Sequence, residues 1–87
     1  MGLSETLKAI SVPERRQILK ILKNDLQSAG YIASHFNLTW ATVSYHLSIL
    51  KKAGVLEEYK FEKNIFYAVN FSAFEDVLTW IKELQEE

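Results

Sequence analysis

The sequence predicts a mainly helical (α+β) fold with its elements in the order ααααββα. The 87 residues contain one proline and three glycines, so few positions interrupt a helix. Apolar residues recur at helical spacing along most of the chain. The exception is residues 56–69, where two runs of strand-forming residues flank a polar turn and predict a β-hairpin. A chain this short is expected to form one domain over residues 1–87.

Two helices are expected to open the chain. Leu3, Leu7 and Ile10 share one helical face. The segment Ser11-Val12-Pro13-Glu14 is typical of a helix start, with Ser11 as the cap and proline in the first turn. This second helix is predicted to end at Asn24-Asp25. Its apolar face consists of Ile18, Leu19, Ile21 and Leu22.

Two more helices are predicted on either side of a tight turn at Asn37-Leu38. The first covers residues 28–36. Thr39 is a good N-cap for the second, which covers residues 40–53 and is followed by Gly54, a residue favoured after a helix end. Its inward positions are Val43, Leu47 and Leu50.

The hairpin and a last helix complete the expected fold. Residues 56–61 and 65–69 form its strands around Glu62-Lys63-Asn64, and a short strand near Val55 stays undecided. Ser72 and Glu75 have the spacing of a capping box that opens the last helix. The apolar stripe of that helix contains Phe74, Val77, Leu78, Ile81 and Leu84.

No catalytic or metal-binding constellation occurs in the sequence. It has no cysteine, and His35 and His46 lie inside helical apolar patterns, where a packed or surface histidine is common. It also lacks the H-E-x-x-H, G-x-S-x-G and phosphate-binding glycine motifs. Glu57-Glu58 has the pattern of a solvated edge. We therefore expect no enzyme activity, no metal and no cofactor.

The same sequence argues against membrane insertion. No apolar run approaches the roughly 18–20 residues that cross a bilayer. Residues 1–6 lack the features of a signal peptide. A cytoplasmic protein is expected.

The net charge is −1, which at first argues against a nucleic-acid partner. The charge is divided, however, since residues 75–87 carry −4 and residues 1–74 carry +3. Moreover, the outer face of the helix over residues 40–53 carries hydroxyl side chains and no acidic residue. An ordinary surface helix mixes Glu and Lys, whereas a helix that enters a DNA groove avoids carboxylates. DNA binding is therefore favoured.

The hairpin that follows this helix offers Lys60 and Lys63 for phosphate contacts. It can equally serve only to close the core, because Glu57, Glu58 and Glu62 surround the lysines.

Residues 7–19, 32–55 and 65–70 resemble ArsR-type winged helix-turn-helix repressors. The most specific part is Ser44 and His46-Leu47 followed by Leu50, Ala53 and Gly54. The resemblance implies a homodimer through the first and last helices, with residues 40–53 in the major groove. The cysteine pair of metal-sensing members would fall at Ser28 and Gly30, and residues 72–87 contain no histidine. The chain is thus similar to the metal-independent, Sdp-type autorepressors.

The predicted function is a sequence-specific, homodimeric transcriptional repressor on a pseudo-palindromic operator in double-stranded DNA, with autoregulation as a candidate role. The alternative is a winged-helix module that binds a protein partner, and a protein can also act as its regulator. The predicted DNA-binding residues are Thr39, Trp40, Ala41, Thr42, Ser44, Tyr45, His46, Ser48, Lys51, Lys60 and Lys63. The predicted dimer interface contains Leu3, Leu7, Phe74, Val77, Trp80, Ile81 and Leu84.

Overall fold

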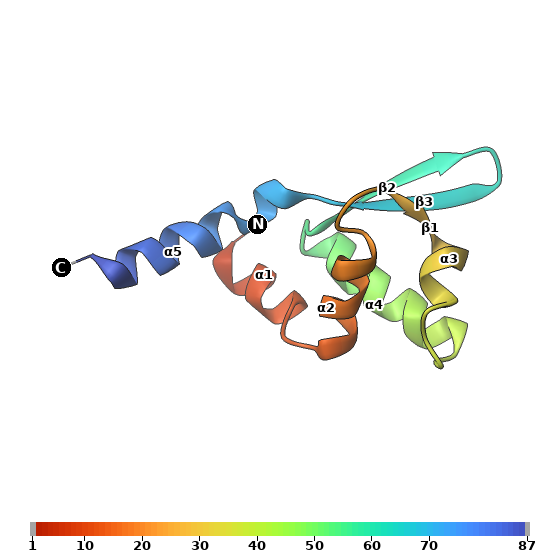
Figure 1. The fold of residues 1–87 in the computed structure, drawn as a ribbon, viewed down its shortest axis with the longest axis horizontal. Coiled ribbons are helices and arrows are strands. Elements are labelled where there is room, and N and C mark those ends of the chain that lie inside the picture. The colour runs from red at the N-terminus through yellow and green to blue at the C-terminus, as the bar shows by residue number, and fades with distance from the viewer. Residues whose placement is uncertain (1, 87) are drawn as a thin grey trace.

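The computed structural model describes residues 2–86. Over these residues the chain forms α1 (Leu3–Ala9), α2 (Pro13–Ile21), β1 (Gln27–Ser28), α3 (Ala29–Ala33), α4 (Trp40–Lys52), β2 (Leu56–Phe61), β3 (Asn64–Val69), the 3₁₀ helix η1 (Phe71–Phe74) and α5 (Glu75–Gln85). The predicted order ααααββα is confirmed, with β1 and η1 added. Figure 1 shows a body made of α1 to α4 and the sheet, from which α5 extends to one side.

The start of α2 confirms one prediction and corrects another. Pro13 occupies the first helical position, where its missing N–H costs no hydrogen bond. The prediction that Ser11 caps this helix is wrong. Val12 is the N-cap residue, and the Ser11 hydroxyl instead donates 2.7 Å to the Lys8 carbonyl at the end of α1. The helix also ends at Ile21, earlier than Asn24-Asp25.

Helices α3 and α4 begin with side-chain caps. Ser28 Oγ accepts from the Tyr31 N–H at 3.1 Å, and Thr39 Oγ1 accepts from the Thr42 N–H at 3.2 Å, as predicted for Thr39. Helix α3 is shorter than the predicted residues 28–36, because the chain tightens into i→i+3 hydrogen bonds at His35 and Phe36.

Helix α4 ends on a left-handed glycine, as the sequence predicts. Gly54 has a φ of 79°. Its N–H donates to the Lys51 carbonyl at 3.0 Å, and the Val55 N–H donates to the Leu50 carbonyl at 2.9 Å. These two bonds form a Schellman motif. Asn70 clamps the same joint, because its Nδ2 donates to the Gly54 carbonyl and its backbone N–H to the Val55 carbonyl.

Replacing Gly54 by Ala is expected to lower the free energy of unfolding by about 1–2 kcal/mol, the cost of a Cβ in the left-handed region. Urea denaturation followed by circular dichroism measures this change. Gly30 is the control, since it lies in α3 with open space where an added Cβ would lie. Gly30→Ala should raise stability by up to about 1 kcal/mol. Equal stabilities of the two variants would contradict the prediction.

The sheet has three strands in the order β1-β3-β2, all antiparallel. The undecided strand near Val55 does not form, whereas β1, which was not predicted, pairs Gln27 with Tyr67 and Ser28 with Phe66. Opposed residues of β2 and β3 share a face. Glu58 and Tyr67 lie on the face toward α4, and Tyr59 and Phe66 on the outer face.

The hydrophobic core lies between the helices of the body and the inner face of the sheet. The three inward positions predicted for α4 are buried, as are Ile18 of α2 and Leu22, the C-cap residue of that helix. Further buried members of the core are Ala9, Ile32, Ala53, Val55, Leu56 and Tyr67. Burial of these apolar side chains supplies the main favourable contribution to folding.

Arg15 is a buried cation within this body. Its Nε donates to the Ala9 carbonyl at 2.7 Å, and its Nη2 reaches the Lys8 carbonyl at 3.4 Å. Its Nη1 lies 3.4 Å from Nδ1 of His46. Because a guanidinium only donates, Nδ1 is the acceptor of this contact. Arg15 thus joins the end of α1 to α4.

Helix α5 begins differently from the prediction. Glu75 is its first residue, but Phe74 is the N-cap residue, and the predicted capping box of Ser72 and Glu75 is wrong. The preceding residues form η1, and the Ser72 hydroxyl donates to Asn70 Oδ1 at 2.7 Å instead. No residue of α5 is buried among the described residues. None of the helices within residues 2–86 is both long and apolar enough to span a membrane.

Candidate nucleic-acid interface

Helix α4 presents part of its outer face to solvent. Ala41, Thr42 and Tyr45 are exposed, with Tyr45 at 59 %. Ser44 and Ser48 are half-buried on the side of the helix that faces the sheet. Residues 26–56 contain no Asp or Glu, so no carboxylate from this stretch opposes an approaching phosphate. Hydroxyl and aromatic groups on such a face can contact bases and backbone.

The start of α4 is shaped by its own cap. Thr39 Oγ1 lies 3.0 Å from Thr42 Oγ1 in addition to its bond with the Thr42 N–H. Trp40 is 55 % exposed and lies beside the hairpin of β2 and β3, here called the wing (residues 56–69). This places the first turn of α4 close to the tip of the wing.

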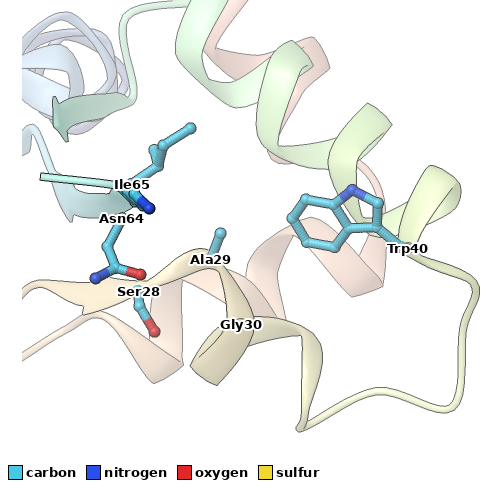
Figure 2. A pocket seen from close by; sticks show the side chains of 7 residues that line it. Ser28, Ala29, Gly30, Trp40, Asn64 and Ile65 are labelled. Carbon is cyan, nitrogen blue, oxygen red and sulfur yellow. The ribbon is translucent and has the colours of Figure 1, made fainter.

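A pocket of about 410 Å³ lies between Trp40 and the wing tip. Figure 2 shows the indole of Trp40 directed across it, with Ile65 and Asn64 of β3 on the opposite side. Its remaining lining residues are Ser28, Ala29, Gly30 and Lys63. The contribution of α3 was not predicted, because no local pattern in Ser28-Ala29-Gly30 indicates which part of the chain it faces. Lys63 and the start of α4 thus border the same hollow.

Lys60 and Lys63 are both exposed on the wing. Lys60 lies opposite Ile65 in the register of the hairpin. The turn contains Glu62 with a φ of 57°, a left-handed conformation at a residue that is not glycine. Lys63 follows Glu62 directly, so its positive charge lies beside a negative one at the tip of the wing.

His46 lies apart from the outer face of α4. It is half-buried, and its Nδ1 contacts Arg15 on the side of the helix nearer α2. Its ring also lies 5.9 Å, centroid to centroid, from that of Tyr45. The structure therefore places this predicted site residue in a contact between helices, whereas Tyr45 next to it is exposed.

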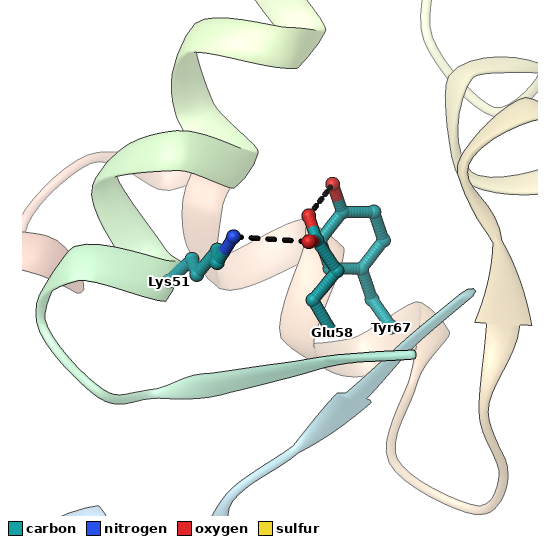
Figure 3. Close-up of polar contacts among 3 residues, drawn as sticks. All are labelled: Lys51, Glu58 and Tyr67. Carbon is teal, nitrogen blue, oxygen red and sulfur yellow. Dashed lines mark hydrogen bonds and ion pairs between the residues drawn. The ribbon is translucent and has the colours of Figure 1, made fainter. Parts of the chain in front are cut away.

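Lys51 is joined to the wing by Glu58. The Lys51 Nζ lies 2.9 Å from Glu58 Oε1, and the Tyr67 hydroxyl donates to Glu58 Oε2 at 3.0 Å. Figure 3 shows the carboxylate held between the two partners. The expectation that Glu57-Glu58 is a solvated edge is correct for Glu57, which is exposed, and wrong for Glu58. The period of two in a strand turns these neighbours to opposite faces.

The hydrogen bond from Lys51 lowers the pKa of Glu58, so this carboxyl is ionised at neutral pH. Burial raises the pKa of Tyr67 to about 12, and its bond to Glu58 acts in the same direction. The phenol therefore remains a donor at neutral pH. The contribution of the lowered Glu58 pKa to stability is present above its unfolded pKa and is lost as the pH falls through the folded one.

The residues predicted for a dimer interface lie on α1, η1 and α5. Leu7 is exposed on α1, and Leu3 is half-buried. On η1 and α5, Phe74 and Val77 are half-buried. Trp80 and Ile81 are each 41 % exposed, and Leu84 is 66 % exposed. Thr6 of α1 ties the two regions together through a 3.4 Å bond to the Ala73 carbonyl. The apolar side chains of Leu78, Trp80, Ile81 and Leu84 on α5 are thus left exposed in the single chain.

The comparison with protein families matches residues 12–58 to the arsR family of bacterial regulatory proteins. The chain is 39 % identical over 79 residues to the transcriptional repressor SdpR of Bacillus subtilis strain 168, covering 91 % of this chain and 88 % of the relative. It is 32 % identical over 82 residues to an HTH-type transcriptional regulator of Methanocaldococcus jannaschii, covering 93 % and 92 %.

Solved structures share the fold. An ArsR family transcriptional regulator superimposes with a TM-score of 0.91 at 23 % identity, covering 95 % of this chain and 91 % of that one. HlyU from Vibrio cholerae N16961 gives a TM-score of 0.77 at 26 % identity, covering 93 % and 88 %. The predicted winged helix-turn-helix fold is therefore confirmed. With the family match over most of α2 to β2, the chain belongs to the ArsR family of bacterial regulatory proteins, which are DNA-binding transcriptional regulators and not enzymes.

Proposed function

We propose that this protein is a homodimeric transcriptional repressor that binds a pseudo-palindromic operator without a metal effector, and that its own promoter is one target. The observation that carries the proposal is the outer face of α4, exposed and free of acidic residues, with the wing beside it. That the protein represses transcription is inferred from its relative in Bacillus subtilis, which is a transcriptional repressor.

The apolar stripe of α5 supports a dimer. A large apolar surface left open on a small domain is typical of an interface, where aromatic residues such as Trp80 are enriched. Two copies joined there would present two α4 helices to two half-sites.

The donor set supports independence from metal. Within residues 2–86, no three His, Cys, Asp or Glu side chains are grouped so that they could hold a metal ion. Ser28 and Gly30 also provide no thiolate. A chelator should therefore leave DNA binding unchanged.

Fluorescence anisotropy with duplexes from the region upstream of the protein's own gene tests the proposal. Specific binding should exceed binding to a random duplex by about 10³-fold or more and should weaken steeply with salt. Equal affinity for every promoter duplex and for random DNA would overturn it.

Two substitutions separate the contributions to this binding. Tyr45→Ala removes an exposed group from the outer face of α4 and is expected to reduce discrimination between operator and random duplex by about tenfold, the effect of one base contact of 1–3 kcal/mol. Lys63→Ala removes a charge from the wing and should weaken binding to both duplexes equally. A uniform loss in Tyr45→Ala would place this side chain on the phosphates.

A second function, binding of a protein through the wing, is favoured by one observation. The outer face of the sheet has a hollow of about 570 Å³. The exposed apolar residues Leu26, Tyr59 and Phe61 line it together with Phe66 and Ala68. A stoichiometric protein partner in a pull-down, together with no retardation of DNA, would favour this function over the first.

A further inference from the structure

A cleft of about 270 Å³ separates α4 from the wing. Its lining residues are Ser44, Ser48, Lys51, Lys52, Glu58 and Tyr67. A single phosphodiester strand divides the major groove of a duplex from the neighbouring minor groove. If α4 enters the major groove and the wing approaches the minor groove, as the proposed function requires, that strand passes over this cleft.

Glu58 introduces a carboxylate at this crossing point. Its side chain is 18 % exposed, and the Lys51 side chain is 51 % exposed. Their contact is the one ion pair within 4.0 Å found over residues 2–86, so the other cations of the described chain are not neutralised in this way. Tyr67 fixes the second carboxylate oxygen and so keeps Glu58 directed toward α4.

We propose that Glu58 restrains the affinity of this protein for DNA by neutralising Lys51 where the phosphate backbone crosses between α4 and the wing. The inference rests on the proposed DNA-binding function. A phosphate that approaches Lys51 meets a cation whose charge is already balanced 2.9 Å away. Binding at this pair therefore releases few of the counterions condensed on the DNA, whereas an unpaired lysine would release more.

The local charge of the pair gives an order of affinities for four proteins. The wild type contributes no net charge at this point. Glu58→Gln contributes one positive charge, and Lys51→Met leaves one negative charge. The double variant is neutral again. We therefore expect the tightest binding from Glu58→Gln, the weakest from Lys51→Met, and a return close to wild-type affinity in the double variant.

The experiment uses the full chain and a labelled random-sequence duplex, because a phosphate contact does not depend on sequence. Anisotropy titrations between about 50 and 200 mM KCl give the affinity and its salt dependence. Glu58→Gln should bind about 3- to 10-fold more tightly at the lowest salt and steepen the slope of log K against log salt by about 0.9 per bound subunit. Lys51→Met should lower the affinity and make the slope of log K against log salt shallower.

Glu57→Gln is the matched control. It removes the same charge from the adjacent residue, but Glu57 lies on the outer face of the sheet, opposite Ala68. Its affinity should stay within about twofold of the wild type, with an unchanged slope, because exposed charges at a distance are screened by salt. Thermal unfolding of all variants verifies that each is folded.

Three results would overturn the inference. Glu58→Gln could bind no more tightly than the wild type, which would mean that the carboxylate positions Lys51 for DNA. Glu57→Gln could equal Glu58→Gln, which would leave only a general charge effect. The double variant could stay as weak as Lys51→Met. A wild type that binds no duplex would overturn the proposed function as well, whereas these three results leave that function intact.

Discussion

Replacing Ile81 by Asp is expected to convert the proposed dimer into a monomer and to weaken binding to an operator with two half-sites by about 10²- to 10⁴-fold, the gain that linkage of two binding modules provides. Ile81 lies on the apolar stripe of α5 and is 41 % exposed in the single chain. A carboxylate buried there in a dimer would lose its hydration without a partner. Sedimentation equilibrium measures the oligomeric state, and anisotropy measures DNA binding.

Thr79→Asp is the control for this prediction. Thr79 is exposed on the same helix, two residues from Ile81 and therefore close to the opposite face. Thr79→Asp adds the same negative charge as Ile81→Asp, so both variants increase the repulsion between α5 and DNA by the same amount. We expect the Thr79 variant to remain a dimer with nearly unchanged affinity. A dimer that survives Ile81→Asp would exclude this stripe from the interface.

Arg15→Met is expected to lower the free energy of unfolding by about 2–3 kcal/mol, because it leaves one buried and one partly buried acceptor without their charged donor. Methionine retains much of the side-chain volume, so the change reports mainly on hydrogen bonds. The affected acceptors are the Ala9 carbonyl, 2.7 Å from Nε, and His46 Nδ1, 3.4 Å from Nη1. Urea denaturation gives the change in stability.

The neighbouring Arg16 offers a matched comparison. It is exposed, and its Nη1 donates to the Ile10 carbonyl at 2.8 Å. Water can replace this exposed donor, so Arg16→Met should cost less than about 1 kcal/mol. If both variants lost the same stability, the buried contacts of Arg15 would not be the cause.

The sequence predicted best where local chemistry decides the structure. Thr39 marks the start of α4 and Gly54 follows its end, because a side-chain cap and a left-handed residue act on their own neighbours in the sequence. It failed where a distant partner decides. The two residues of β1 form a strand only because β3 lies beside them. Ser11 fits the start of a helix equally well, but its hydroxyl bonds to the end of the preceding one.

The candidate site shows the same division. Helical periodicity identified the outer face of α4, including Tyr45. It could not reveal that His46 is held by Arg15, or that Lys51 is held by Glu58. Those contacts depend on how α2 and the wing pack against α4, and no spacing in the sequence encodes that packing.

The position of Asn70 limits the spacing between operator half-sites that a dimer of this protein can accept. It clamps the joint between α4 and the wing and is followed directly by η1, which leads into α5. In a dimer formed through α5, the connection from the dimer interface to α4 and the wing would therefore be short and rigid. Such a dimer would discriminate between operators by the spacing of their half-sites as well as by their sequence. An operator with one base pair inserted between its half-sites would present the second half-site rotated by about 35° and about 3.4 Å farther away, beyond the reach of so short a connection.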